Sequence, residues 1–443
     1  EWPNNPDMSV DDARYSMIRY LPSETENAYG PRIVDPRSGE IIESHICWYH
    51  NVMNLVRKWY ITQCGPLDKR AQGWELDDEL MGQLIRFVSS HEVGHSLGLR
   101  HNMLASSATP VEKLRDKSWV EKHGHTASIM DYARFNYVAQ PEDHISPKGL
   151  FPRINDYDLW AIKWGYQYRP EFLTPQQEQE TLRAEVTKVL QNNVRLRYIG
   201  DEGRGQDPRS QTEDLGDNSM KASDYGILNL KRVMNNIEQW TVQKDGKTDN
   251  LKELHKSVCG QFQRYIGHVQ RNINGRYDNN FPSERRYETV PKERQQEAIS
   301  WIGRHVFDAP LWLYPDNIVT KTGIDAEYEM TSRSNKALSY LLSPATLYKQ
   351  DKNGLISASP YPVDEYLDDV FKSVWKPMAD ADKRTNTYRR QLERTYIEAL
   401  NTIVNPTEKQ LAVIAADTRR SDVVLYVLQH LNTIETFCRQ QKA

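Results

Sequence analysis

The segment from His91 to His101 carries the residues best suited to chemistry, and it reads His-Glu-Val-Gly-His-Ser-Leu-Gly-Leu-Arg-His. His91 and His95 are four residues apart, so one turn of a helix brings both imidazoles to the same side. Gly98 lets the chain leave the helix sharply, which allows His101 to return as a third ligand. Zinc binds such nitrogen ligands tetrahedrally, and three protein ligands leave one position for water, as in catalytic sites. The spacing therefore predicts one catalytic zinc ion.

Glu92 directly follows the first of these histidines. A carboxylate at that position reaches a water molecule on the metal without ligating the metal itself. Zinc acidifies its water and polarises a carbonyl group, while a nearby carboxylate accepts the proton and later delivers it to the leaving amine. We therefore expect Glu92 to act as the general base of an amide hydrolysis.

A second group of interest is Ser128-Ile129-Met130-Asp131-Tyr132, in which Met130 lies 29 residues after His101. With the histidine motif, these residues resemble the metzincin clan of zinc peptidases, whose members place a methionine in a tight turn beneath the metal. The resemblance implies that Met130 forms an apolar floor under the imidazoles. It also implies zinc as the cofactor and a polypeptide as the substrate.

Tyr132 lies two residues after Met130, as in the Ser-x-Met-x-Tyr turn of the astacin and serralysin branches. That similarity implies a phenol near the zinc, where it would stabilise the tetrahedral intermediate. Asn102 does not match the residue that either branch has after the third histidine. The alternative for Tyr132 is a structural tyrosine whose hydroxyl bonds to a backbone partner.

The wider pattern resembles large bacterial metzincin-like peptidases that carry a helical extension. The matching pieces are residues 30–41, 91–102, 128–132 and 156–166. The resemblance implies an exported protein that acts outside the cytoplasm, as a secreted, periplasmic or cell-surface enzyme.

Two other interpretations of the motif remain open. A thermolysin-like ligand set would replace His101 by a downstream glutamate, for which Glu112 and Glu121 are the candidates. A binding protein with a silent site is the second alternative, although a protein without catalysis has no need for Glu92. His123 and His125 precede the methionine turn and are candidates to line the cleft.

The elements that position the motif follow from the hydrophobic pattern. Residues 13–20 and Ile41 to Tyr49 read as strands, and the second of these is a candidate to hold substrate as an added strand. Residues 51–63 read as a helix. The active-site helix starts near Asp77 and ends at Gly98, and one face carries Leu80, Leu84, Phe87, Val88, His91 and His95.

The pattern changes near residue 170, after which helical periodicity dominates. The expected helices are 177–191, 221–243, 251–274, 292–307, 363–375, 383–403 and 407–439. We therefore predict an α+β fold, with a metzincin-like catalytic domain over residues 1–170, built on a small twisted sheet and the active-site helix. A mostly α-helical C-terminal extension is predicted over residues 171–443.

The composition narrows the classes of protein to which this sequence can belong. Lys and Arg number 57 against 61 Asp and Glu, a net charge of −4 that gives no general attraction to nucleic acid. No apolar run approaches the roughly 18 residues that span a bilayer. The first residues contain no signal-peptide pattern, so we expect any export signal or upstream domain to lie outside this sequence.

Cysteines and acidic residues leave two questions open. Cys47, Cys64, Cys259 and Cys438 form no C-x-x-C pair. Cys47 and Cys64 are the nearest candidates for a disulfide, with four free thiols as the alternative. The acidic stretch 207–218 leaves calcium open as a second ion, although it lacks the EF-hand pattern. We expect it to be a solvated connector.

Overall fold

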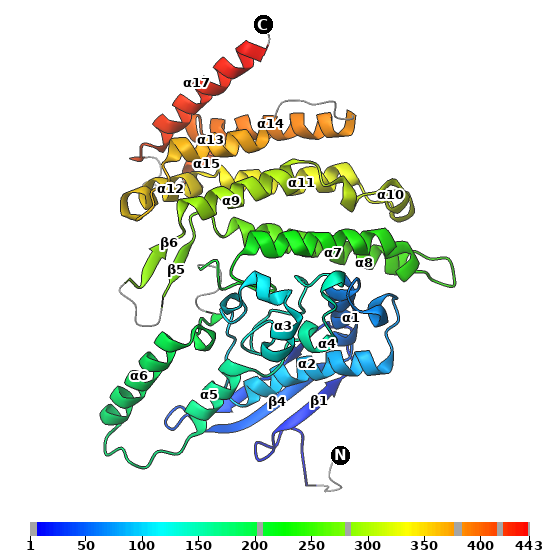
Figure 1. Ribbon diagram of the computed structural model, residues 1–443, viewed down its shortest axis with the longest axis vertical. Helices are drawn as coiled ribbons and strands as arrows, with labels where there is room; N and C mark the ends of the chain where they lie inside the picture. The colour runs from blue at the N-terminus through cyan, green and yellow to red at the C-terminus, as the bar shows by residue number, and fades with distance from the viewer. Residues whose placement is uncertain (1–6, 202–206, 280–284, 376–382, 414–419, 442–443) are drawn as a thin grey trace. The chain divides into compact units, whose positions relative to one another are not determined.

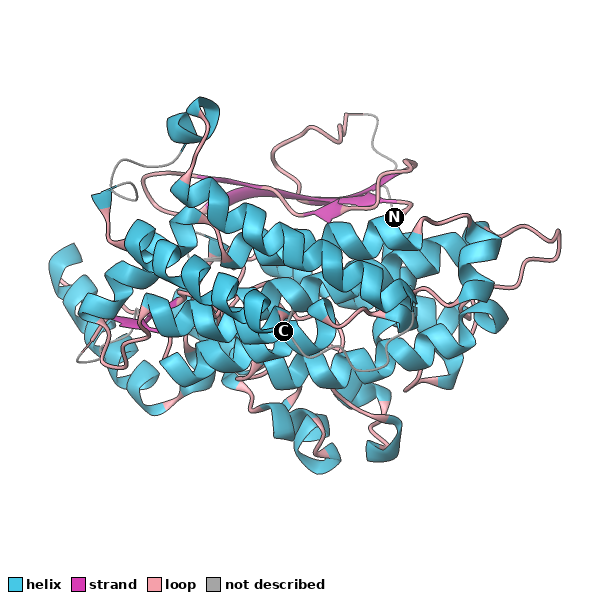
Figure 2. Ribbon diagram, turned by 90° about the horizontal axis from the view of Figure 1, so that it is seen from above, coloured by secondary structure: helices cyan, strands magenta, loops and turns pink. Residues whose placement is uncertain are grey.

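The computed structural model describes residues 7–201, 207–279, 285–375, 383–413 and 420–441. These residues pack into two compact units. The first contains residues up to 201 together with 209–261, and the second contains 207–208, 262–279 and the described residues from 285 onward. The chain is mostly helical, and its strands gather into two small sheets (Figure 2).

The sheet of the first unit is built around one long strand, β4 (Ile41–Tyr49). The parallel strand β1 (Met17–Leu21) pairs with residues 45–49 of β4. The short strands β2 (Ala28–Tyr29) and β3 (Arg32–Val34) pair antiparallel with its other side. Since His45–Tyr49 has a partner strand at β1, and Cys47 and Trp48 also pair with β2, a substrate strand cannot be added there. The expectation that Ile41–Tyr49 holds the substrate as an added strand is therefore wrong for residues 45–49.

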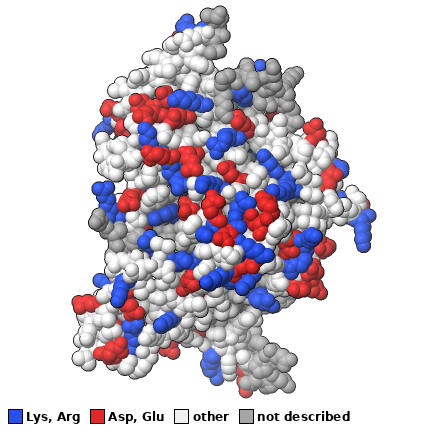
Figure 3. Space-filling view, in the orientation of Figure 1, with Lys and Arg blue, Asp and Glu red and all other residues white. Residues whose placement is uncertain are grey.

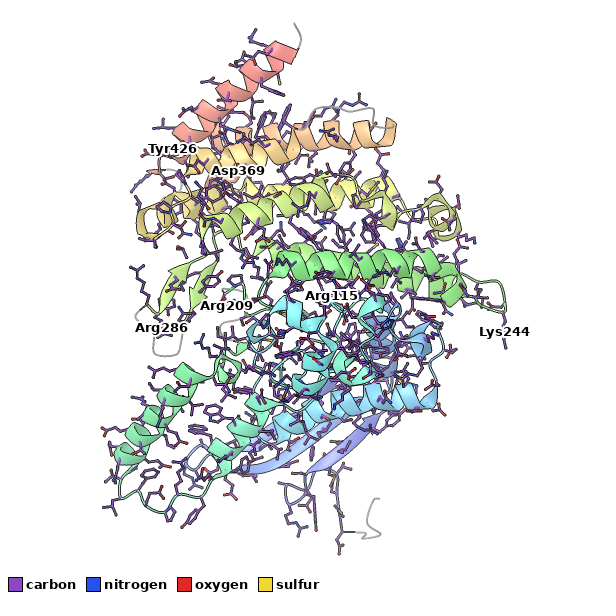
Figure 4. All side chains as sticks on the ribbon, viewed as in Figure 1. Arg115, Arg209, Lys244, Arg286, Asp369 and Tyr426 are labelled. Atoms are coloured by element: carbon purple, nitrogen blue, oxygen red, sulfur yellow. The ribbon has the colours of Figure 1, made fainter. Side chains whose placement is uncertain are left out.

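Helices and irregular connecting segments make up the rest of the first unit, and α2 runs beside β4 (Figure 1). Their bounds are α1 (Val52–Cys64), α2 (Asp78–Ser96), α3 (Lys117–His123), α4 (Pro147–Leu150), α5 (Asp156–Tyr166), α6 (Pro175–Asn192) and α7 (Ser219–Trp240). The helix α8 (Asp249–Gln270) begins in this unit and ends in the second. Arg115 makes one of the polar contacts inside the first unit (Figure 4), since its guanidinium donates a 2.7 Å hydrogen bond to Asp143.

The second unit is a helical assembly with one hairpin, β5 (Arg276–Asp278) and β6 (Tyr287–Thr289). Its helices are α9 (Lys292–Ile302), α10 (Asp316–Thr322), α11 (Ala326–Leu341), α12 (Pro344–Ile356), α13 (Val363–Val374), α14 (Lys383–Val404), α15 (Glu408–Val413) and α17 (Val423–Gln441). α11 packs on α14, and α14 packs on α17. Trp301, Tyr366 and Tyr396 are fully buried, so this unit has an aromatic core of its own.

Most helices predicted from periodicity are found within a few residues of the expected bounds. The helix predicted over 407–439 is wrong as one element, because α15 ends at Val413 and α17 starts at Val423. The chain between the helices predicted over 251–274 and 292–307 contains the strands β5 and β6. The predicted domain boundary near residue 170 stays a prediction.

The structure tests three further predictions. All four cysteines are free thiols, so Cys47 and Cys64 form no disulfide. No helix within the described ranges is long and apolar enough to cross a membrane. The stretch 207–218 is not a solvated connector, since Asp207, Glu213 and Asp214 are at most 4% exposed. On the face drawn in Figure 3, charges of both signs are interleaved.

Candidate metal centre

The helix α2 positions the first two histidines. Its start is fixed by Asp77, whose carboxylate accepts a hydrogen bond from the Leu80 backbone at 2.7 Å. Leu80 and Leu84 are fully buried, and this apolar face orients His91 toward the interior. Gly98 ends the helix at φ +93°, a conformation that favours glycine. The predicted helix and its two ends are confirmed.

Three histidines meet beyond this helix. One ligand atom from each of His91, His95 and His101 lies within 4.8 Å of the others. The Nε2 atoms of His95 and His101 are 3.2 Å apart. The structure thus brings together the three residues whose spacing predicted a metal site, and the cluster could hold a metal ion.

The other ring nitrogen of each histidine has an oxygen partner. His91 Nδ1 lies 2.8 Å from the Ile129 carbonyl, and His95 Nδ1 lies 3.0 Å from the Leu99 carbonyl. His101 Nδ1 lies 2.8 Å from a carboxylate oxygen of Asp201. Since these oxygens accept hydrogen bonds, each Nδ1 carries the proton in a neutral ring and each Nε2 keeps its lone pair.

This arrangement fits a zinc ion. His91 Nε2 is buried and has no hydrogen-bond partner, which is costly unless the atom binds something else. Burial, followed by the neighbouring His95, lowers the pKa of His91 to about 3, so the ring is neutral. Burial also lowers the pKa of His95. Three imidazoles that converge on one point match the donor set that zinc prefers.

Glu92 lies beside this cluster and is only 6% exposed. Burial raises the pKa of its carboxyl to about 7, against the opposing effects of the Arg134 charge and a hydrogen bond from the Gly30 backbone. Its Oε2 atom is buried without a hydrogen-bond partner. A carboxylate with a pKa near neutrality is suited to accept and return a proton.

Gly30 must be glycine for this contact. A Cβ atom there would lie 2.8 Å from the Glu92 carbonyl oxygen and 3.4 Å from Oε2. The turn between β2 and β3 therefore approaches α2 so closely that only a residue without a side chain fits. No local signal at residue 30 indicated this role.

Met130 lies against the opposite surface of α2. A Cβ at Gly94 would lie 2.3 Å from the Met130 sulfur, so the methionine occupies the space above this glycine. The Met130 carbonyl accepts a hydrogen bond from the Asn102 backbone, directly after the third histidine. Asp158 fixes the same turn by accepting bonds from the Ser128 hydroxyl at 2.6 Å and the Ile129 backbone at 2.8 Å.

Tyr132 lies beside the histidine cluster. Its ring centroid lies 5.3 Å from that of His91 and 4.5 Å from that of His101. On its other side, the Arg134 guanidinium lies 4.4 Å from the Tyr132 ring and 3.8 Å from the Trp59 ring. The Tyr132 carbonyl accepts a 2.7 Å hydrogen bond from the Glu213 backbone.

The remaining candidates lie elsewhere. Glu112 pairs with Lys221, and Glu121 accepts a bond from the Ser146 backbone, so neither joins the histidines. His125 is fully buried and bonds to the Arg134 carbonyl at 3.0 Å rather than lining a cleft. The His123 ring packs on Trp119. Sequence reasoning missed Arg134 and Asp201, and only proximity in the fold identifies them.

The comparison with protein families supplies the class of protein. The Met-zincin family model matches residues 74–382, well over half of the chain, and this range includes all three histidines, Met130 and Tyr132. The chain belongs to the Met-zincin family, which places it among the zinc metallopeptidases. The match also extends far past residue 170, so the family pattern includes much of the helical region. No curated protein and no solved structure matches the chain.

Proposed function

We propose that this chain is a zinc-dependent endopeptidase in which His91, His95 and His101 hold one zinc ion and Glu92 is the general base. The observation that carries the proposal is the convergence of three imidazoles beside a buried carboxyl with an unpartnered oxygen. The bound zinc would supply a Lewis acid that acidifies water and polarises the scissile carbonyl.

The chain's own residues would transfer the proton and stabilise the oxyanion. Glu92 accepts the proton of the attacking water at Oε2 and donates it to the leaving amine. Tyr132 donates a hydrogen bond to the developing oxyanion from its position beside two of the histidine rings. Met130 keeps the underside of the centre dry and α2 fixed in place. The resemblance to exported peptidases supports a site of action outside the cytoplasm.

Two variants separate the roles of ligand and base. Glu92→Gln is expected to keep about one zinc per chain while turnover of an unfolded protein substrate falls by orders of magnitude, since Glu92 is not a ligand. His101→Ala is expected to lose zinc and activity together. Zinc content by elemental analysis and cleavage of a peptide library measure both.

Two results would contradict the proposal. Cleavage by the parent protein that persists in excess chelator would exclude a zinc peptidase. Zinc binding by the parent without cleavage of any peptide would favour the binding protein with a silent site.

A further inference from the structure

Two non-glycine residues near the histidine cluster adopt the left-handed backbone conformation. Arg134 has φ +59° and Glu213 has φ +62°, in a region that residues with a side chain rarely occupy. The two residues are also an ion pair, since Arg134 Nε lies 3.8 Å from a carboxylate oxygen of Glu213. Residues held in this region store strain, and they persist where the surrounding structure fixes them, most often at functional sites. The pair is therefore a candidate for a functional role.

The Arg134 guanidinium contacts two aromatic rings. It lies 4.4 Å from the centroid of the Tyr132 ring and 3.8 Å from that of Trp59, which belongs to α1. A guanidinium is planar and stacks on aromatic faces, whereas a lysine ammonium is a compact point charge. The centroid of the Tyr132 ring also lies 5.3 Å from that of His91 and 4.5 Å from that of His101. The Tyr132 ring thus contacts both the histidine cluster and a stack that rests on α1.

The backbone around Tyr132 is fixed by other contacts. The Tyr132 carbonyl accepts a 2.7 Å hydrogen bond from the Glu213 backbone, and the Arg134 carbonyl lies 3.0 Å from Nε2 of the buried His125. Glu213 is itself buried, in the acidic stretch 207–218. Since these bonds hold the backbone without the guanidinium, loss of the stack should release the ring of Tyr132 and leave its backbone in place.

We propose that Arg134 is a positioning residue, which acts through Tyr132 by holding its ring in one orientation beside the metal centre. Trp59 and Glu213 hold the guanidinium in turn. The inference rests on the proposed function, in which the Tyr132 phenol stabilises the oxyanion. A phenol that can turn away spends only part of its time in place, and a displacement of about 1 Å can cost up to about 10²-fold in rate.

Arg134→Lys tests this role with the charge kept. Lysine can still pair with Glu213, but it has no planar group to stack on the two rings. Arg115→Lys is the matched control, because the Arg115 guanidinium likewise lies 4.6 Å from the centroid of the Tyr225 ring and pairs with Asp143. Both stacks belong to the first compact unit, so the two variants differ in which tyrosine loses its guanidinium.

The first measurement needs neither zinc nor activity. Tyrosine carrying carbon-13 at Cζ is incorporated into the zinc-free full chain, and Tyr132→Phe identifies the resonance of Tyr132. This carbon lies on the axis of ring flips, so its NMR line reports movement of the phenol itself. We expect one sharp resonance in the parent, which Arg134→Lys broadens or splits and Arg115→Lys leaves unchanged. A resonance that stays sharp in Arg134→Lys, or equal changes in the two lysine variants, overturns the inference.

The second measurement is kinetic and uses the zinc-loaded chain. Arg134→Lys should lower kcat on the order of tenfold with KM near that of the parent, since the phenol acts on the oxyanion rather than on the bound substrate. In a chain that already carries Tyr132→Phe, Arg134→Lys should cost nothing further, because its effect passes through the phenol. An equal loss in the two backgrounds assigns Arg134 to another task and overturns the inference.

A second variant covers the case in which Arg134→Lys does not fold. Trp59→Leu keeps the guanidinium and removes the ring that supports it from α1. It should broaden or split the Tyr132 resonance in the same way. A sharp, unchanged Tyr132 resonance in folded Trp59→Leu would contradict the role of the stack.

The two measurements separate this inference from the proposed function. If the Tyr132 resonance depends on Arg134 in a parent chain that cleaves no peptide, the positioning role stands and the peptidase fails. If the parent cleaves peptides and its Tyr132 resonance is the same in Arg134→Lys, the peptidase stands and the positioning role fails.

Discussion

Each histidine of the metal centre uses its two ring nitrogens differently. The Nδ1 atoms are held by the Ile129 carbonyl, the Leu99 carbonyl and the Asp201 carboxylate, which leaves the Nε2 atoms to converge. These partners fix the tautomer and the orientation of the rings before any metal arrives. The orientation of the three rings is therefore set by hydrogen bonds to three separate stretches of chain.

Tyr132 is the residue whose role most needs a test. If its phenol stabilises the oxyanion, Tyr132→Phe should lower kcat and kcat/KM by similar factors of about 10²–10³. Zinc content and thermal stability should stay near those of the parent. Steady-state kinetics on a fluorogenic peptide, together with thermal unfolding, check both expectations.

Tyr60→Phe is the control for a structural tyrosine. The Tyr60 hydroxyl donates a buried 2.8 Å hydrogen bond to Asp68, so its loss should cost about 1 kcal/mol of stability without changing turnover. If Tyr132→Phe behaves like this control, Tyr132 is structural and another donor stabilises the oxyanion.

His125 makes the stability of the fold depend on pH. It is fully buried, and burial followed by the Arg153 charge lowers its pKa from 6.5 to about 4. Between pH 6.5 and 4 the unfolded chain therefore binds a proton that the folded chain does not. This group's contribution to the free energy of unfolding is present above pH 6.5 and falls as the pH drops through this window, by about 3 kcal/mol in all.

His125→Gln tests this expectation, because the glutamine amide can still donate to the Arg134 carbonyl but cannot titrate. Urea unfolding of the zinc-free chain at several pH values should show a weaker pH dependence between 6.5 and 4 in the variant. Parallel curves for parent and variant would show that other groups govern acid unfolding.

At the scale of elements, α2 and the turn that carries Met130 are fitted to each other. Gly94→Ala places a Cβ where the Met130 sulfur lies, so the methionine must move. We expect a loss of about 1–3 kcal/mol in the free energy of unfolding. Gly82→Ala in the same helix meets nothing within 4 Å and should stabilise by up to about 1 kcal/mol.

The double variant Gly94→Ala, Met130→Ala makes the test specific. Removing the methionine side chain relieves the clash, so the combined loss should be smaller than the sum of the single losses. Additive losses in chemical unfolding would mean that the two residues do not compete for space.

The features that the sequence predicted well depend on residues close together in the chain. Residues 91–101 indicated the cluster of three histidines and the end of α2, because helical spacing and a glycine after the helix act within a few residues. Asp201 lies 100 residues after His101, and no periodicity links the two. Gly30 likewise contacts Glu92 only through the folding of the sheet onto α2. Such long-range contacts depend on tertiary packing, which composition and spacing do not describe.

Long-range contacts also explain the predictions that were wrong. The stretch 207–218 is acidic and turn-rich, so it was predicted to be solvated, yet the Glu213 backbone bonds to Tyr132 and Val111 bonds to Asp217. The segment 316–356 was not predicted as helical, because Ser, Thr and Asn interrupt its apolar pattern. Those residues are tolerated in α11 because it packs on α14.

At the scale of the whole molecule, zinc should stabilise one part of the chain. The histidines and their partners all belong to the first compact unit. A ligand that binds only the folded state adds about 2.7 kcal/mol at one hundred times its dissociation constant. Hydrogen exchange should therefore slow on zinc addition in residues 78–201 and stay unchanged in residues 292–375.

His101→Ala is the control for this effect and should abolish it, whereas Glu92→Gln should keep it. Protection that rises equally in both units would contradict a zinc site confined to the first.

The bond between His101 and Asp201 also bears on how the protein is made. During synthesis the histidine motif leaves the ribosome first, then Met130, then Asp158, and Asp201 last. A nascent chain that ends before Asp201 has the three histidines but lacks the carboxylate that orients the third ring. Completion of the centre is thus delayed until the 100 residues after His101 have been translated, which would keep the centre immature while its own chain is still unfolded.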